Sequence, residues 1–408
     1  MDIKYIRSKF PALKNNFIFM DNAGGSQILG STVDYINDYL INSNVQLGAS
    51  YAVSEKAGER LAKTTSSIAE FINASHKNEV VIGPSTTMLL RILSLSISQN
   101  WKEGDEVIVT NSDHEANVSC WTDLEKKGIK IKVWKIDPKS FELENKDLKA
   151  LLSNKTKLVA VTHTSNVLGT INPIKKIAKI VHEAGALICV DGVAYAPHRK
   201  VDVQDWDVDF YTFSWYKVYG PHLALMYGKL HLLTNMPGIN HYFFKPDDVP
   251  YKFQPGNFNF ELTYGLKGIL EYFEEMADHH LDGKTALSVP EKYDTSFDMV
   301  ATYEEVLAAR LLNYLNSVEE IKIIGNTSGD KNKRVPTIAF VHNSFMSSDI
   351  VRKMDHEKIG IRFGDFYAKK LIQDLNLEEK HGVVRISLVH YNTEEEVDKL
   401  ITAFKKIF

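Results

Sequence analysis

Residues 186–217 contain the stretch that decides the fold. It begins with ALICVD at 186–191 and, after a polar interval, ends with DFYTFSWYK at 209–217. Each run is a short apolar segment rich in branched or aromatic residues, which is typical of a strand buried on both faces of a sheet. Asp191 ends the first run, and Ser214 and Lys217 end the second. The stretch therefore predicts two buried strands with polar groups at their carboxyl ends.

The same alternation extends outward from this stretch, from residue 79 to residue 227. Short β-rich runs alternate with helical segments such as 174–184, whose apolar residues fall on one face. This order predicts an α/β fold with a mostly parallel, doubly wound sheet. The predicted strands are 80–82, 106–110, 129–136, 157–162, 186–190, 209–213 and 223–227.

A different pattern begins after residue 260. Long helices are predicted at 262–276 and 303–317, then an alternating segment at 334–341, a strand at 382–390 and a helix at 393–408. We expect a large domain over residues 16–265 and a smaller α+β domain formed by residues 1–15 and 266–408.

Composition excludes several classes of protein. The chain has 408 residues, 44% of them hydrophobic, and a formal net charge of -4, which gives no basic surface for nucleic acid or an acidic membrane. No apolar run is long enough to span a bilayer, and residues 1–10 do not form a signal peptide, so we expect a cytoplasmic protein. The two cysteines, Cys120 and Cys189, have no metal-ligand spacing, and no metal site is predicted.

Polar residues follow several predicted strands, at the edge where open α/β sheets bind ligands. Thr86 and Thr87 begin a predicted helix, where hydroxyls and free N–H groups can bind an anion, although an ordinary helix cap uses the same residues. His114 could stack on a planar cofactor or be a plain loop residue. Asn166 lies in a polar turn that is also compatible with no ligand.

The carboxylate of Asp191 and the amine of Lys217 complete this set. A carboxylate that ends a buried strand needs a cationic partner, which could be a pyridinium nitrogen or a structural Arg or Lys. A lysine among aromatic residues has a lowered pKa and can form a Schiff base, although a lone lysine there is more often a surface residue. Together the hydroxyls, imidazole, amide, carboxylate and amine suit a phosphorylated, planar, cationic cofactor.

These segments resemble the class V aminotransferase superfamily of fold-type I pyridoxal-phosphate enzymes, particularly its cysteine desulfurase and selenocysteine lyase branch. The resemblance runs from FMDNAGGSQ at 19–27 to RISLVHYNT at 385–393 and is most specific at 163–173, 190–192 and 209–221. It implies a fold-type I enzyme that binds pyridoxal 5'-phosphate, acts on a small amino acid and forms a homodimer with active sites at the subunit interface.

The resemblance also implies roles for individual residues. Lys217 would form the imine and move the substrate proton, Asp191 would pair with the pyridine nitrogen, and His114 would stack on the ring. Arg385 would bind the substrate carboxylate, with Asn166 close to cofactor and substrate and Arg362 as a further substrate ligand. The implied phosphate ligands are Thr86, Thr87, Ser214, Tyr216 and, from the neighbouring subunit, Asn257.

Three positions depart from the family pattern. Tyr216 replaces the histidine before the lysine, and Ala194 replaces a glutamine. In the segment that begins at Arg362, Tyr367 stands where desulfurases have their mobile cysteine, and neither Cys120 nor Cys189 lies in that segment. A mechanism through an enzyme persulfide is therefore not expected.

The leading functional hypothesis is a carbon–sulfur lyase that eliminates at the substrate β-carbon, with Tyr367 as the general acid or as a packing residue only. An aminotransferase or an amino-acid epimerase would share every cofactor residue. A catalytically silent scaffold is the third hypothesis, and the joint presence of Lys217, Asp191 and Arg385 argues against it.

Overall fold

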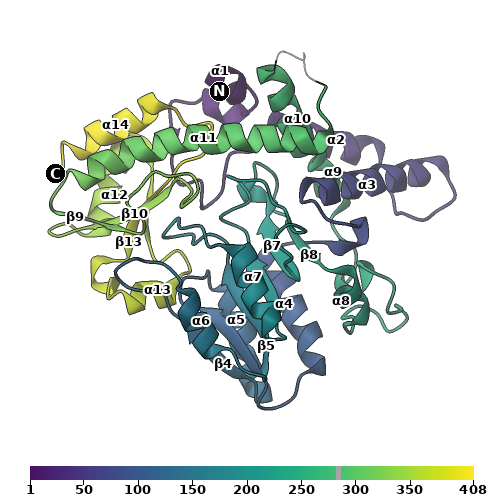
Figure 1. The fold of residues 1–408 in the computed structure, drawn as a ribbon. Helices are drawn as coiled ribbons and strands as arrows, with labels where there is room; N and C mark the ends of the chain where they lie inside the picture. Colours follow the sequence, from purple (N-terminus) through teal and green to yellow (C-terminus); the bar gives the residue numbers. More distant parts are fainter. Residues whose placement is uncertain (282–285) are drawn as a thin grey trace.

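A seven-stranded sheet forms the centre of the computed structural model, which describes residues 1–281 and 286–408 (Figure 1). The strand order is β2-β8-β7-β6-β5-β3-β4, and every pair is parallel except the two that involve β8. The strands are β2 (Val80–Gly83), β3 (Glu106–Thr110), β4 (Lys130–Trp134), β5 (Thr156–Thr162), β6 (Leu187–Asp191), β7 (Phe210–Ser214) and β8 (Ala224–Gly228). They match the predicted strands closely, and the predicted fold class is confirmed.

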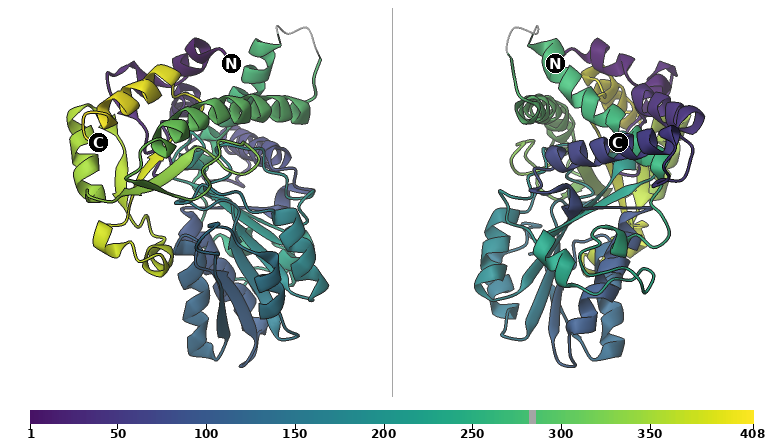
Figure 2. Two further views of the ribbon diagram at one scale, coloured as in Figure 1. Left: turned by 60° about the vertical axis from the view of Figure 1, so that its left-hand side comes forward. Right: turned by 90° about the vertical axis from the view of Figure 1, so that its right-hand side faces the viewer.

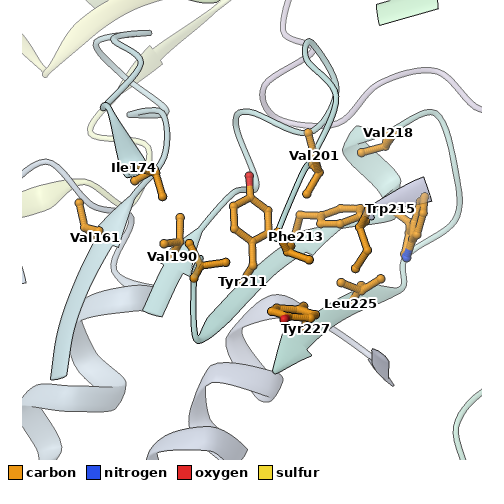
Figure 3. Close-up of a cluster of buried hydrophobic side chains, with 14 of the residues drawn as sticks. Val161, Ile174, Val190, Val201, Tyr211, Phe213, Trp215, Val218, Leu225 and Tyr227 are labelled. Carbon is orange, nitrogen blue, oxygen red and sulfur yellow. The ribbon is translucent and has the colours of Figure 1, made fainter. Parts of the chain in front are cut away.

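Both faces of this sheet are buried under helices. Helices α4 (Thr86–Ile97) and α5 (Ala116–Thr122) cover one face, and α7 (Ile174–Glu183) covers the other. Within β5, Leu158 packs into the core under α4 and α5, which we call the first core, and Val159 into the core under α7, the second core. The two differ because successive strand residues point to opposite faces. Figure 3 shows the second core, where Val161 and Val190 lie near Ile174. Burial on both faces explains why these strands are almost continuously apolar.

A smaller sheet lies beside the central one (Figures 1 and 2). It is antiparallel in the order β12-β13-β10-β9, and a separate parallel pair joins β1 to β11. The strands are β1 (Ile18–Phe19), β9 (Ile321–Ile324), β10 (Thr337–His342), β11 (Ile359–Gly360), β12 (Arg362–Gly364) and β13 (Val383–Ser387). Helices α12 (Ser347–His356) and α14 (Glu394–Phe404) pack with this sheet. No helix in the described part of the chain is both long and apolar enough to cross a membrane.

The helix boundaries after residue 260 differ from the prediction. The single helix predicted at 262–276 is two helices, α9 (Phe260–Gly265) and α10 (Lys267–His280). The helix predicted at 303–317 is α11 (Val289–Asn316), which begins much earlier because Ser288 and Glu291 form a capping box and Pro290 occupies the first turn. The alternating segment predicted at 334–341 overlaps β10, which begins at Thr337; all residues of β10 are buried, and it lies between β9 and β13 in the smaller sheet.

Two glycines give a direct test of helix packing. Helix α2 (Gly30–Asn42) packs against α10 so closely that a Cβ on Gly268 would lie 2.5 Å from the backbone nitrogen of Thr32. Gly58, inside α3 (Ala52–Phe71), has no such neighbour within 4 Å. We expect Gly268→Ala to lower the free energy of unfolding by about 1–3 kcal/mol, because overpacking forces the helices apart.

The matched control is Gly58→Ala, which should raise that free energy by about 0.5–1 kcal/mol, since alanine favours a helix over glycine. Urea denaturation followed by circular dichroism measures both values. Equal effects of the two substitutions would contradict close packing of α2 against α10 at Gly268.

Candidate active site

A cavity lies at the carboxyl edge of the central sheet, where β2, β3, β5, β6 and β7 end. Eight of the residues predicted from the sequence line it: Thr86, Thr87, His114, Asn166, Asp191, Ser214, Tyr216 and Lys217. They come together because the carboxyl ends of parallel strands meet at one edge. The cavity is also lined by Thr162 and Thr164, which the sequence analysis did not single out.

Lys217 ends a short 3-10 turn that follows β7 directly, and its side chain is buried. Burial and, to a smaller extent, the nearby Arg385 guanidinium lower the pKa of its amine to about 8, against the opposite effects of Asp191 and Asp21. A substantial fraction of the amine is therefore neutral near physiological pH. A neutral amine is the form that reacts with an aldehyde.

Asp191 is the last residue of β6 and is also buried. Its Oδ1 accepts a hydrogen bond of 2.9 Å from the backbone N–H of Val193. Burial raises the pKa of the carboxyl to about 6, against the opposite effects of this hydrogen bond and of Lys217. A cationic ring nitrogen beside Asp191 would favour the ionised carboxylate.

His114 follows β3 and presents a neutral ring. Its Nδ1 accepts the backbone N–H of Ala116 at 3.0 Å, so the remaining proton of the neutral ring is on Nε2. Burial, together with the nearby charges of Lys217 and Arg385, lowers the pKa of the imidazole to about 4. The ring is therefore uncharged and can stack on a planar group.

Asp113, the residue before His114, fixes this loop and was missed in the sequence analysis. Its carboxyl group accepts hydrogen bonds from Asn117 at 2.7 Å and from the backbone of Thr162 at 3.0 Å, which connects the end of β3 to the end of β5. Burial raises the pKa of this carboxyl to about 8. Its place at a predicted strand end was the only sequence signal for it.

The N-terminus of α4 lies at the cavity. Thr86 and Thr87 are the first two residues of this helix, and Ser85 caps it by accepting the N–H of Met88 at 3.2 Å. The Thr86 Oγ1 lies 2.8 Å from the Ser214 Oγ, so hydroxyls from two strand ends meet here. Free helical N–H groups together with hydroxyl groups suit a phosphate.

Tyr216 borders this cavity in place of the family's histidine. Its ring stacks on that of His222, with centroids 4.7 Å apart and planes 8° apart. His222 was not predicted as a site residue. The stacking fixes the plane of the Tyr216 ring at the cavity wall.

Arg385, on β13, reaches the same region from the smaller sheet. It is buried, and its Nη2 donates to Asp21 Oδ1 at 2.7 Å while Nη1 donates to the Asn166 carbonyl oxygen at 3.1 Å. Its guanidinium also lies 3.8 Å from the centre of the Phe366 ring. Asp21 was missed as a site residue, although it lies within the 19–27 motif.

Tyr367 lies beside His114, outside the set of residues that line the cavity. Its ring centroid is 5.3 Å from that of His114, and the residue is 69% exposed. Phe366 and Tyr367 both have left-handed backbones, with φ of 54° and 59°, which is uncommon for bulky residues. The turn is held by the Asn166 side chain, which donates to the Phe366 carbonyl at 2.8 Å, and by the Glu115 N–H, which donates to the Tyr367 carbonyl at 2.7 Å.

Two other predicted residues lie away from the cavity. Arg362, on β12, has an exposed side chain whose Nη1 is 3.9 Å from Asp21 Oδ2. Asn257 lines separate cavities together with Gln254 and Phe258. Their predicted roles toward substrate and toward a neighbouring subunit stay predictions.

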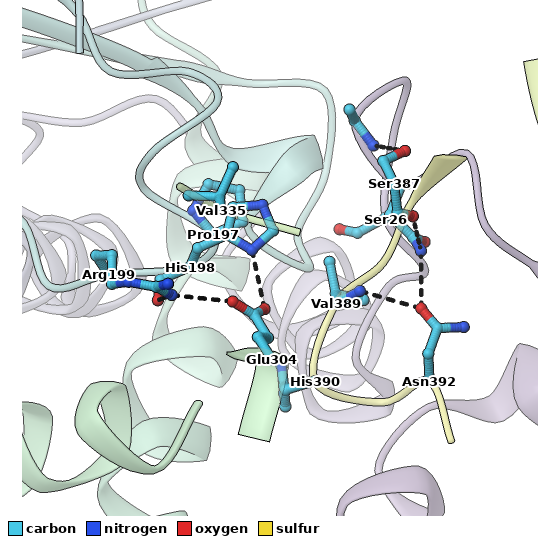
Figure 4. Close-up of polar contacts among 12 residues, drawn as sticks. Ser26, Pro197, His198, Arg199, Glu304, Val335, Ser387, Val389, His390 and Asn392 are labelled. Carbon is cyan, nitrogen blue, oxygen red and sulfur yellow. Dashed lines mark hydrogen bonds and ion pairs between the residues drawn. The ribbon is translucent and has the colours of Figure 1, made fainter. Parts of the chain in front are cut away.

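A row of hydrogen bonds supports the turn that bears Lys217. The Tyr219 hydroxyl donates its only proton to the Pro197 carbonyl at 2.8 Å, so the His390 Nδ1, 3.1 Å away, must be its donor. The His390 Nε2 then accepts from the Tyr272 hydroxyl at 2.6 Å, and burial lowers the pKa of this imidazole to about 3. Figure 4 shows the adjacent buried contacts of Glu304 with His198 and Arg199.

The cavity fits pyridoxal phosphate. The Asn166 Oδ1 and the Thr164 Oγ1 are buried without a hydrogen-bond partner among the described residues, which leaves acceptors free for a ligand. The anion-binding helix end, the neutral ring of His114, the Asp191 carboxylate and the Lys217 amine match the phosphate, ring, ring nitrogen and aldehyde of this cofactor.

Comparison with known proteins gives one consistent result. The family model for class V aminotransferases matches residues 18–286 and 283–400. The chain is 42% identical to the aminotransferase-like protein FGM3 of Gibberella zeae, over 99% of this chain and 98% of that protein. It is 34% identical to the cysteine desulfurase-like protein ustD of Aspergillus flavus, over 97% of this chain and 88% of that protein.

Solved structures agree on the fold. The apo cysteine desulfurase from Thermococcus onnurineus superposes with a TM-score of 0.88 at 23% identity, over 99% of this chain and 97% of the other. The cysteine desulfurase CsdA from Escherichia coli gives a TM-score of 0.84 at 23% identity, over 100% of this chain and 98% of the other. The chain is thus a pyridoxal-phosphate-dependent enzyme, and it belongs to the class V aminotransferase family.

Proposed function

We propose that this protein is a lyase that breaks a carbon–sulfur bond at the β-carbon of a small amino acid and releases a free thiol. The observation that carries the proposal is the position of the two cysteines relative to that of Tyr367. Cys120 and Cys189 are buried in the core between the sheet and helices α4 and α5, and burial raises the pKa of both thiols. Tyr367, by contrast, lies exposed beside His114. The Tyr367 hydroxyl is therefore accessible beside His114, whereas neither cysteine can present a thiolate there.

Each residue then has a defined task. Bound pyridoxal phosphate supplies an electron sink for the bond that breaks. Arg385 and Asn166 bind the substrate carboxylate, and Lys217 in its neutral form removes the proton from the α-carbon. The carbon–sulfur bond breaks, and Tyr367 donates a proton to the leaving sulfur. The unsaturated amino acid that remains adds water and yields a keto acid and ammonia.

We further propose that the active unit is a homodimer. Asn257 does not line the cavity that contains Lys217, and it lies in a segment that resembles the phosphate-contacting piece of a neighbouring subunit. Exposed apolar side chains on the helices and loops near residues 40–53 and 242–251 are available for such an interface: Leu40, Ile41, Tyr51, Val53, Tyr242, Phe243 and Tyr251.

The pKa of Lys217 predicts how the apoprotein takes up its cofactor. Because the amine titrates near pH 8 rather than 10.5, its neutral fraction rises about tenfold between pH 7 and pH 9 and then levels off. The rate of cofactor uptake, followed by absorbance, should show the same plateau. Arg385→Gln removes a cation that lowers this pKa and should move the plateau to higher pH. A rate that keeps rising beyond pH 10 in the native protein would contradict the assignment.

The proposed role of Tyr367 predicts a dependence on the leaving group. Tyr367→Phe should lower kcat by about a hundredfold for S-alkyl cysteines, since an alkyl thiolate needs a proton, with little change in KM. For S-(nitrophenyl)cysteine, whose thiolate leaves without help, the same substitution should have little effect. Equal losses for both substrates would show that Tyr367 only packs the turn.

The lyase reaction itself is tested by measuring thiol, keto acid and ammonia from S-substituted cysteines. We expect equal amounts of the three products, and the variant carrying both Cys120→Ala and Cys189→Ala should retain the rate within about twofold because neither thiol reaches the cavity. Conversion of the cofactor to its amine form without thiol would identify an aminotransferase. Exchange of the α-hydrogen without net product would identify an epimerase, and no reaction with any S-substituted cysteine would refute the proposed lyase activity.

A further inference from the structure

The guanidinium of Arg385 already makes two hydrogen bonds and one aromatic contact. Asp21 Oδ1 accepts from Nη2 at 2.7 Å, the Asn166 carbonyl accepts from Nη1 at 3.1 Å, and the Phe366 ring covers one face at 3.8 Å. Only Nε is buried without a partner among the described residues. The residue is 2% exposed, so an unpaired donor here is a costly arrangement that a ligand would relieve.

The open donor determines how a carboxylate can approach. The Nε–H and one Nη2–H point along the same edge of the planar guanidinium, and a carboxylate binds such an edge with two parallel hydrogen bonds. At Arg385 the Nε end of this edge has no partner among the described residues, and the Nη2 end already donates to Asp21 Oδ1. A carboxylate that binds Nε and Nη2 together would lie against the Asp21 carboxylate, and the two like charges repel each other.

Asp21 has a second cation within reach. Its other oxygen, Oδ2, is 3.9 Å from Arg362 Nη1, and the two side chains are 29% and 59% exposed. Both line an outer groove of about 700 Å³, and Tyr216 borders this groove as well as the cofactor cavity. A Cβ on Gly24 would lie 2.8 Å from Asp21 Oδ2, so the glycine leaves room for the carboxylate on this side. Asp21 can leave Arg385 without losing an ionic partner.

We propose that Asp21 is a specificity-determining residue that occupies the carboxylate position of Arg385 until a substrate carboxylate displaces it toward Arg362. The proposal rests on the proposed function only in taking Arg385 as the substrate-carboxylate ligand. Two arginines and one aspartate carry a net charge of +1, and one added carboxylate neutralises the group. An amine without a carboxylate leaves the Asp21–Arg385 pair closed, so the site selects amino acids over simple amines.

The experiment uses the holoenzyme and propionate, which has a carboxylate but no amine and no leaving group. Isothermal titration calorimetry gives its dissociation constant for the native protein, Asp21→Asn, Arg362→Gln and the double variant. Asp21→Asn should bind propionate about tenfold more tightly, or about 1.4 kcal/mol, because the competing charge is gone. Arg362→Gln should weaken binding about tenfold when Asp21 is present and have no effect in the Asp21→Asn background, as a double-mutant cycle detects.

Several results would overturn the proposal. Weaker or unchanged binding to Asp21→Asn would show that Asp21 holds Arg385 in place rather than competes, and equal effects of Arg362→Gln in both backgrounds would show that Arg362 binds propionate directly. Absence of propionate binding to every variant would also refute it. Asp34→Asn is the matched control, because this exposed residue should leave the affinity unchanged.

Asp21→Ser provides a second variant in case the asparagine destabilises the fold, and it should tighten binding in the same direction. Propionate cannot undergo elimination, so this outcome is independent of whether S-substituted cysteines release thiol. The competition at Arg385 and the lyase activity can therefore fail separately.

Discussion

Burial of two opposite charges on neighbouring parallel strands is the constraint on which the rest of the site depends. Asp191 ends β6, Lys217 lies just beyond β7, and Asp191 pairs in register with Thr212 of β7. Burial moves the two pKa values toward each other, to about 6 and about 8, because it disfavours both charged forms. A cofactor with an aldehyde would react with the neutral amine that burial favours at Lys217, and its cationic ring nitrogen would restore the ionised form of Asp191. The helix end at Thr86 and the neutral ring of His114 line the same cavity as this pair.

The central sheet and most of the cavity could be predicted from the sequence for a simple physical reason. Strands buried on both faces are continuously apolar, so each strand end is marked by the first polar residue, as at Asp191 or Thr110. The helices after residue 260 were less predictable. The first half of α11 buries Tyr293, Phe297 and Val300 at helical spacing, but its start is marked by the polar capping pair Ser288 and Glu291 rather than by an apolar residue.

Contacts between distant segments were beyond sequence reasoning. Asp21 and Arg385 are separated by 364 residues and still form one ion pair, and Asn166 reaches the backbone of Phe366 across 200 residues. Neither contact leaves a local pattern in the sequence, because its two partners lie in segments far apart along the chain. For the same reason, the resemblance of residues 19–27 to a family motif did not reveal that Asp21 pairs with Arg385. The positions of Arg385 and of the turn at Phe366 therefore depend on tertiary contacts, whereas the cavity at the strand ends depends on strand order.

The hydrogen-bonded row from Tyr272 through His390 and Tyr219 to Pro197 has a single direction. Since the last acceptor is a carbonyl that can never donate, the position of every proton in the row follows from that one end. The His390 imidazole is thus held in one tautomer by the Pro197 carbonyl, which lies two hydrogen bonds away along the row. A second proton on this ring would leave the Tyr272 hydroxyl without its acceptor. The turn that bears Lys217 is therefore held by a row of hydrogen bonds whose donors and acceptors cannot exchange roles.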